Sequence, residues 1–300
     1  MEDLLSVADL DPDALRRLLD LADELRSDRR QRHELTGRTV ALIFEKPSTR
    51  TRVSFQVAVA ELGGHPLPLS AQELQLGRGE TLADTGVVLS RYVHAIVLRT
   101  FGQDRLEQLA AAAAVPVVNA LSDSEHPCQA LADLQTVRTE CGTLEGVTLA
   151  YVGDGNNVAH SLLLAGGLAR MQVRIGHPSG YAPDTHVVEQ ARALGATVVV
   201  TEDARAAVQG ADAVYTDVWA SMGQEAEAEQ RRRTFAPYRV DATLMRAAAP
   251  GAIFLHCLPA HRGEEVTDEV LDGPASRVLD QAENRLHVQK ALLLTLLGGA

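Results

Sequence analysis

The chain has 300 residues, of which 46% are hydrophobic, so it is long enough for one large globular domain or two of ordinary size. Its 28 basic and 40 acidic residues give a net charge of −12, which argues against nucleic acid as a partner, because a phosphate backbone needs a basic face. Three cysteines without a CxxC pair, an acidic amphipathic start, and no apolar run of about 20 residues predict a cytoplasmic protein without disulfides, leader peptide or membrane anchor.

In the first half of the chain, short apolar runs alternate with segments whose apolar residues recur at helical spacing. The first helix is expected to have Asp11 as its N-cap and Pro12 in its first turn. The expected strands are residues 39–45, 94–100 and 116–121, and the expected helices are 9–30, 48–64 and 126–140.

The second half of the chain repeats this alternation. The expected strands are residues 147–154, 172–178, 197–203, 211–219 and 252–258, and the expected helices are 157–171, 184–195 and 276–299. Strands that alternate with helices form parallel sheets covered on both faces. The chain is therefore predicted to be an α/β protein with two doubly wound parallel-sheet domains.

The two alternating halves meet in a polar, glycine-containing stretch within residues 135–147. We place one domain at residues 1–138 and a second at 139–280, and we expect a C-terminal helix, 281–300, to pack back on the N-terminal domain. Residues 223–238 are dense in charge and poor in core residues, so we expect an exposed, mobile loop there, with a solvated helix face as the alternative.

A run of hydroxyl and guanidinium side chains, residues 48–52, follows the first expected strand and opens a helix. The unpaired N–H groups and the dipole at a helix start favour an anion, and an arginine there can bind a phosphate with two hydrogen bonds. Hydroxyl groups in the same place can instead cap the helix, so capping is the alternative interpretation.

Four further cationic or polar residues lie in the expected strands and helices. Arg99 ends a strand, where ligands of parallel sheets bind, although a surface salt bridge is the alternative. His126 and Gln129 open a helix and could donate to a carbonyl oxygen that gains charge, although they could also cap that helix. Arg285 leads into the last helix and could reach a ligand or pair with a neighbouring carboxylate.

Polar residues also follow the strands of the second half. Gly153 and Gly155 lie in the turn after strand 147–154, but the pattern lacks a third glycine and an acidic residue for a ribose. A tight turn or a small polar ligand therefore fits better than a dinucleotide. Asp217 suits an ammonium group or a helix cap, and Cys257 can act through its thiol, through its backbone, or as a buried structural residue.

Taken together and in this order, the motifs resemble the aspartate/ornithine carbamoyltransferase superfamily from end to end. FEKPSTRTR at residues 44–52 is similar to the carbamoyl-phosphate signature of that family. DVWASMG at 217–223 and HCLP at 256–259 are similar to the ornithine branch, since the aspartate branch carries a different sequence at the latter place. Residues 75–81 lack the lysine of the aspartate branch, which also favours the ornithine branch but leaves the role of Arg78 open.

The resemblance implies transfer of the carbamoyl group of carbamoyl phosphate to the δ-amine of L-ornithine, giving citrulline and phosphate, a step of arginine metabolism. It implies a homotrimer or a multiple of trimers and no cofactor. No metal is expected, because no pair at zinc-binding spacing occurs among His126, Cys128, His256, Cys257 and His261. The alternatives are transfer to putrescine or another amine and, from a different class, a nucleotide-dependent oxidoreductase.

The resemblance also implies the members of the two substrate sites. The expected carbamoyl-phosphate site contains Ser48, Thr49, Arg50, Thr51, Gln75, Arg99, His126, Pro127, Cys128, Gln129, Cys257, Leu258 and Arg285. The expected ornithine site contains Asn157, Asp217, Ser221 and Met222, the last two on a closing loop. The expected catalytic residues are Arg50, Arg99, His126, Asp217 and Cys257.

Within these sites the resemblance implies particular roles. His126 would polarise the carbamoyl oxygen, and Cys257 and Leu258 would face the carbamoyl amide through their backbone carbonyls. Asp217 and Cys257 would orient and deprotonate the attacking amine, and Gln75 would come from a neighbouring subunit. The position of Cys128 varies in the family motif, so its side chain is assigned no role.

Overall fold

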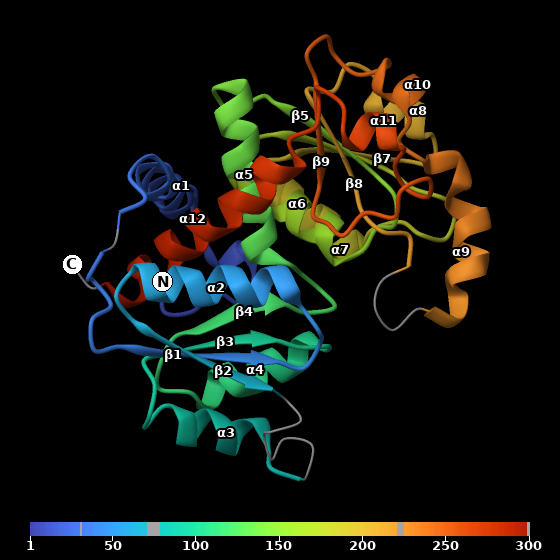
Figure 1. Ribbon diagram of the computed structural model, residues 1–300. Coiled ribbons are helices and arrows are strands. Elements are labelled where there is room, and N and C mark those ends of the chain that lie inside the picture. The colour runs from blue at the N-terminus through green and yellow to red at the C-terminus, as the bar shows by residue number, and fades with distance from the viewer. Residues whose placement is uncertain (31, 71–78, 221–224, 299–300) are drawn as a thin grey trace. The chain divides into compact units, whose positions relative to one another are not determined.

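The computed structural model describes residues 1–30, 32–70, 79–220 and 225–298 (Figure 1). The chain forms two compact units: unit 1 contains residues 1–132 and 283–300, and unit 2 contains residues 133–282. Each unit has one parallel sheet with helices on its faces, so the predicted α/β fold with two doubly wound sheets is confirmed. No helix in the described part of the chain has the length and apolar character that crossing a membrane requires.

Unit 1 is built on a four-stranded parallel sheet of order β2-β1-β3-β4. Its strands are β1 (Thr39–Phe44), β2 (His65–Ser70), β3 (Ala95–Arg99) and β4 (Val117–Leu121). Its helices are α1 (Pro12–Ser27), α2 (Thr49–Glu61), α3 (Leu82–Leu89) and α4 (Gln103–Ala112). The core between the sheet and α3 and α4 contains Ile43, Leu98 and Leu106, while α2 lies on the opposite face (Figure 1).

Both ends of unit 1 follow the sequence-based expectations. Asp11 caps α1 by accepting the N–H of Ala14 at 2.7 Å, and Pro12 is the first helical residue. The last helix, α12 (Val278–Leu297), belongs to this unit from Glu283 onward, so the expected return of the C-terminal helix is confirmed.

Strand β2 is missing from the sequence-based prediction, because its sequence HPLPLS contains Pro66 and Pro68. Proline cannot donate a backbone hydrogen bond and is therefore rare inside sheets. Among the described residues, β2 pairs only with β1 and is an edge strand, which needs only one row of its backbone groups for pairing.

Unit 2 is built on a five-stranded parallel sheet of order β7-β6-β5-β8-β9. Its strands are β5 (Thr148–Val152), β6 (Gln172–Gly176), β7 (Thr197–Thr201), β8 (Ala213–Thr216) and β9 (Ile253–His256). Its helices are α6 (Asn157–Leu168), α7 (Thr185–Leu194), α8 (Ala204–Val208), α9 (Ala228–Phe235), α10 (Ala242–Met245) and α11 (Asp268–Leu271). Helix α5 (Pro127–Cys141) leads from unit 1 into unit 2.

Both sheets are wound in two directions. In unit 1 the chain runs from β1 to β2 and then returns to the other side of β1 to form β3. In unit 2 it runs from β5 outward to β6 and β7 and then returns to form β8 beside β5. The loops after β1 and β3, and those after β5 and β8, therefore leave in opposite directions, which creates the crevice where such sheets bind ligands.

Residues 225–238 are helical, so the prediction of a mobile loop is wrong for them and the helical alternative is right. A short 3-10 turn at Glu225–Glu227 leads into α9, and a second one follows at Ala236–Tyr238. The buried side chains of Arg231 and Phe235 are one helical turn apart. Arg231 pairs with Asp154 at 2.6 Å, so a charge that looks solvated in the sequence holds this helix in place.

The Gly153–Gly155 turn between β5 and α6 is closed by backbone packing. The N–H of Gly155 donates to the carbonyl of Tyr181 at 2.9 Å. A Cβ atom at Gly155 would lie 2.2 Å from the nitrogen of Pro183 and 2.5 Å from the carbonyl carbon of Ala182. The glycine therefore serves close packing of two loops, as the tight-turn interpretation requires.

Glu125 ties the N-terminus to the loop before α5. Its carboxylate accepts the hydroxyl of Ser6 at 2.5 Å and the N–H of Val7 at 2.9 Å. Burial raises the pKa of Glu125 to about 7, and the two hydrogen bonds oppose that rise.

We expect Gly155→Ala to lower the free energy of unfolding by roughly 1–3 kcal/mol, because the clash is with backbone atoms that cannot rotate away. Urea titration followed by circular dichroism measures this loss. The control is Gly102→Ala, where φ is −66° and a new Cβ meets only the side-chain carboxylate of Asp104, which can turn aside. Equal losses in the two variants would contradict the packing role of Gly155.

We expect Glu125→Gln to change how stability depends on pH. The folded-state pKa lies above the unfolded one, so the wild-type contribution is complete below pH 4.5 and is lost as the pH rises through about 7. Over this pH range, the free energy of unfolding of the wild type should fall by up to about 3 kcal/mol relative to that of the glutamine variant. Urea titrations from pH 4.5 to pH 8 test this, with exposed Glu107→Gln on α4 as the control. A pH-independent difference would refute it.

Candidate functional site

In unit 1, the start of α2 presents the hydroxyl and guanidinium run after β1. Ser48 is the N-cap residue by its extended backbone, but its side chain makes no capping hydrogen bond. The capping interpretation is therefore wrong for Ser48, because its hydroxyl makes no hydrogen bond that caps the helix. Thr49 and Arg50 are exposed in the first turn, beside the positive end of the helix dipole. This arrangement suits an anion.

Arg285 links three distant segments behind this turn. One amino group of its buried guanidinium donates to Thr51 Oγ1 at 2.7 Å, and the other donates to Gln129 Oε1 at 2.8 Å. These bonds join α12 to α2 and to α5. Arg285 thus adds a buried positive charge beside the helix start, and Thr51 and Gln129, two of its partners, are predicted site residues.

Arg99 ends β3 directly beside the end of β1, since Arg99 pairs in register with Phe44. The pairing of β3 with β4 shifts register between Leu98 and Arg99, an irregularity of the kind that redirects a side chain. Only 7% of Arg99 is exposed, so the surface salt-bridge interpretation is wrong. A buried guanidinium therefore lies at the switch point of this sheet.

His126 is buried immediately before α5, which begins at Pro127. Burial lowers the pKa of His126 well below its ordinary value, and the positive charges of Arg285 and Arg99 lower it further. The imidazole is therefore neutral at physiological pH. A neutral imidazole with an N–H can donate to a carbonyl oxygen without adding a third charge to the site.

Cys128 faces the protein interior. Its thiol donates to the carbonyl of Asn119 at 3.5 Å, and burial raises its pKa to about 12. A contact between Cys128 and a ligand would therefore have to come from its backbone.

Sequence reasoning missed Glu45 and Lys46, which hold the loops around this site. Glu45 pairs with Arg105 at 2.5 Å, and Lys46 pairs with Asp123 at 2.5 Å. Lys46 also lies 4.4 Å from the ring centroid of Phe101. A cavity of about 190 Å³ opens beside the start of α2, with Lys46, Ser48 and Arg52 in its wall. The cavity wall thus carries two cationic side chains.

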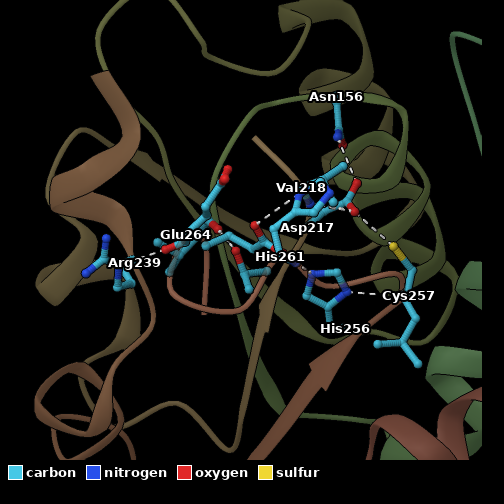
Figure 2. Close-up of polar contacts among 12 residues, drawn as sticks. Asn156, Asp217, Val218, Arg239, His256, Cys257, His261 and Glu264 are labelled. Carbon is cyan, nitrogen blue, oxygen red and sulfur yellow. Dashed lines mark hydrogen bonds and ion pairs between the residues drawn. The ribbon is translucent and has the colours of Figure 1, made fainter. Parts of the chain in front are cut away.

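In unit 2, Asp217 follows β8 and receives three hydrogen bonds (Figure 2). Its Oδ1 atom accepts the backbone N–H of Val218 at 2.8 Å and the thiol of Cys257 at 3.0 Å. Its Oδ2 atom accepts the amide of Asn156 at 3.1 Å. These donors come from the loops after β5, β8 and β9, three neighbouring strands. They fix the carboxylate at the switch point of the sheet.

Asn156 is the contact that sequence reasoning missed, since the prediction named Asn157. The side-chain oxygen of Asn156 caps α6 by accepting the N–H groups of Val158 and Ala159, and its amide remains to bind Asp217. Asn157 is the first residue of α6 and is half-buried. An asparagine directly before an apolar helical run is an N-cap signal that could have found this residue.

Cys257 is a thiol donor and not a thiolate. Burial raises the pKa of Cys257 well above its ordinary value, and the negative charge of Asp217 raises it further. The proton therefore stays on sulfur and points to Asp217. This argues against Cys257 as a base and leaves Asp217 as the acceptor of the pair.

The ligand atoms of Asp217, His256 and Cys257 lie within 4.8 Å of one another, which could suggest a metal site. However, both ring nitrogens of His256 have protein partners. Nδ1 accepts the N–H of Leu258 at 2.8 Å, and Nε2 lies 3.3 Å from Glu265 Oε1. Metal binding through His256 would have to break one of these contacts, so the group does not suit a metal.

Four residues named from the sequence lie outside the described residues. They are Gln75, Arg78, Ser221 and Met222. Within unit 1 the structure groups Thr51, Arg285 and Gln129, with Arg99 and Arg285 acting on His126, and within unit 2 it groups Asp217 with Cys257.

Two family models match nearly the whole chain. Residues 2–139 match the carbamoyl-P binding domain of aspartate/ornithine carbamoyltransferase. Residues 145–296 match the Asp/Orn binding domain of the same family. The first range contains the hydroxyl and guanidinium run at the start of α2, and the second contains Asp217 and Cys257.

Individual proteins of similar sequence and structure agree. The ornithine carbamoyltransferase of Parafrankia sp. is 62% identical over 93% of this chain and 91% of its own, and that of Acidothermus cellulolyticus is 59% identical over 97% and 95%. The solved ornithine carbamoyltransferase of Pyrococcus furiosus has a TM-score of 0.96 at 52% identity, over 100% of this chain and 98% of its own. That of Thermus thermophilus has a TM-score of 0.92 at 46% identity, over 99% of both chains. The chain belongs to the aspartate/ornithine carbamoyltransferase family.

Proposed function

We propose that this chain is an enzyme that transfers the carbamoyl group of carbamoyl phosphate to the δ-amine of L-ornithine, giving L-citrulline and phosphate. The observation that carries the proposal is the group of buried Arg99 and Arg285 beside neutral His126, behind the exposed turn of α2. This group offers phosphate contacts and a carbonyl donor together. The ornithine branch is supported by relatives that bear that name along nearly their whole length.

The residues of unit 1 would bind carbamoyl phosphate. The N–H groups at the start of α2, with Ser48 and Arg50, would hold the phosphate, and Arg99 would neutralise part of its charge. His126 would donate its N–H to the carbamoyl oxygen, which gains charge as the tetrahedral intermediate forms. Because His126 is neutral, it can stabilise that oxygen by a hydrogen bond. A positively charged imidazolium would also attract the phosphate.

The residues of unit 2 would bind the amine. The Asp217 carboxylate would hold the δ-ammonium and accept its proton, since Cys257 retains its own proton. The uncharged amine then attacks the carbamoyl carbon. A C–N bond forms, the C–O bond to phosphate breaks, and the second amine proton leaves with the phosphate. Asn156 and Val218 would keep the carboxylate in place during these steps.

The contacts of Gln75, Asn157, Ser221 and Met222 with the substrates are part of this proposal, as is a homotrimer or a multiple of trimers in the cytoplasm. Their support is the family resemblance. A nucleotide-dependent oxidoreductase is disfavoured, because Gly155 is covered by backbone and β6 is followed by His177 and not by an acidic residue.

The direct test is a ureido-product assay with purified protein, carbamoyl phosphate and four parallel acceptors: ornithine, putrescine, N-acetylornithine and aspartate. We expect citrulline from ornithine and at least about tenfold lower kcat/KM with each other amine, since a missing contact in a polar site costs at least that much. A preference for putrescine would retain the chemistry and refute the acceptor. No product from any amine would refute the proposed function.

The phosphate contact is tested with Arg50→Ala. We expect kcat/KM for carbamoyl phosphate to fall by about 10²–10³, because loss of one such charge-stabilising donor typically has this effect. The melting temperature should stay unchanged, since the side chain of Arg50 is exposed. Arg16→Ala, an exposed arginine on α1, is the matched control and should keep full activity. Near-normal turnover in Arg50→Ala would exclude Arg50 from the phosphate site.

A further inference from the structure

The loop after β9 is held by hydrogen bonds to His256 that the proposed reaction does not use. The His256 ring is buried, and its Nδ1 atom accepts the N–H of Leu258 at 2.8 Å. The backbone N–H of His256 donates to Gln281 Oε1 at 2.9 Å, and Gln281 donates in turn to Asp133 at 2.6 Å. The loop therefore starts from a residue that is fixed both by its backbone and by its ring.

Glu265 is the partner of the other ring nitrogen. Its carboxylate is fully buried, and Oε1 lies 3.3 Å from His256 Nε2. The same oxygen accepts the backbone N–H of His261 at 2.5 Å. Removing a carboxylate from water is costly, so a buried one is retained where its hydrogen bonds matter to the structure.

These contacts decide where the proton of His256 resides. Nδ1 accepts a backbone N–H, so it carries no hydrogen, and the neutral ring must carry its hydrogen on Nε2. That hydrogen points to Glu265 Oε1. The carboxylate thus selects the tautomer, and the tautomer leaves Nδ1 as the acceptor for Leu258.

Leu258 needs this acceptor. Its φ of +57° lies in the left-handed region, which costs a residue with a side chain roughly 1–2 kcal/mol. Such a conformation persists only where the surroundings impose it. The bond from Leu258 to His256 is such a constraint, and it also fixes the adjoining Cys257, whose thiol contacts Asp217.

We propose that Glu265 and His256 are positioning residues for carbamoyl transfer. Glu265 fixes the His256 tautomer, and His256 holds the Cys257–Leu258 backbone so that the Cys257 thiol meets the Asp217 carboxylate. Neither residue touches a substrate, since the His256 ring is enclosed and both its nitrogens are engaged. The reaction named here rests on the proposed function, whereas the effect on the loop does not.

Two pairs of variants distinguish the loss of a hydrogen bond from a change in side-chain volume. In Glu265→Gln, the amide oxygen can still accept both N–H groups, whereas Glu265→Met has no such acceptor. In His256→Asn, the amide oxygen takes the place of Nδ1 and can accept from Leu258, whereas His256→Gln places its amide near Nε2 and cannot. We expect Glu265→Met and His256→Gln to lower kcat for citrulline formation by about 100-fold, as a misplacement of about 1 Å does. Glu265→Gln and His256→Asn should retain most activity.

Two further kinetic readouts distinguish positioning from general damage. Inhibition by inorganic phosphate should be unchanged in all four variants, because the phosphate contacts belong to unit 1. Glu265→Met should lower kcat less in the His256→Asn background than in the wild type, because asparagine has no tautomer to fix and only the hydrogen bond to His261 is then lost. Additive losses of kcat in the double variant, or equal losses of kcat in His256→Asn and His256→Gln, would overturn the proposal.

A readout without turnover is the alkylation rate of Cys257 by iodoacetamide, measured by peptide mass spectrometry with Cys128 as internal reference. In the wild type the high pKa and the contact with Asp217 slow this reaction. We expect Glu265→Met to speed it about tenfold by releasing the loop, and Glu265→Gln to leave it unchanged. If the wild type forms no citrulline, the proposed function fails and this rate still decides the inference. An unchanged rate in Glu265→Met overturns it.

Discussion

The reversal of winding direction within each sheet is the constraint on which both candidate sites depend. At that point the loops from two adjacent strands leave in opposite directions, and backbone N–H groups and side chains can approach a ligand without filling the space between them. In unit 1 the reversal lies between β1, whose following loop carries Ser48, and β3, which ends at Arg99. In unit 2 it separates the loops after β5 and β8, which carry Asn156 and Asp217. Residues far apart in the sequence thus become neighbours because of strand order alone.

Local charge outweighs global charge in unit 1. The chain carries a net charge of −12, which repels an anionic substrate at long range. At short range, the buried guanidinium groups of Arg99 and Arg285 dominate the local electrostatic potential, because interactions between charges strengthen where water is excluded. Burial of His126 lowers its pKa, and the same two groups lower it further, so the site combines two cations with a neutral imidazole. Burial of the two guanidinium groups and of the imidazole together accounts for this combination of charges.

The sequence predicts the parts of this structure that repeat and misses those that depend on distant contacts. Alternating apolar runs predict the strands and helices because each pattern has its own period. The prolines of β2 argue against a strand in the sequence, and only the edge position of β2 makes them compatible with a sheet. The buried face of α9 is missed because the charge of Arg231 predicts an exposed side chain. Its partner Asp154 is distant in the sequence. Likewise, Arg285 is a plausible ligand contact in the sequence, but its hydrogen bonds to Thr51 and Gln129 span 234 and 156 residues and have no local signal.

Carboxylates in this protein acquire different roles from their surroundings. Asp217 accepts hydrogen bonds from an asparagine amide, a thiol and a backbone N–H, whereas the fully buried Glu265 contacts a histidine ring and a backbone N–H. The donors to Asp217 are themselves fixed by structure: Asn156 by capping α6, and Cys257 by the loop that His256 holds. The orientation of the reactive carboxylate is therefore set by a helix cap and a histidine tautomer. In the proposed mechanism, a change that disturbs either one acts on the reaction through Asp217, even though the altered residue does not contact the substrate.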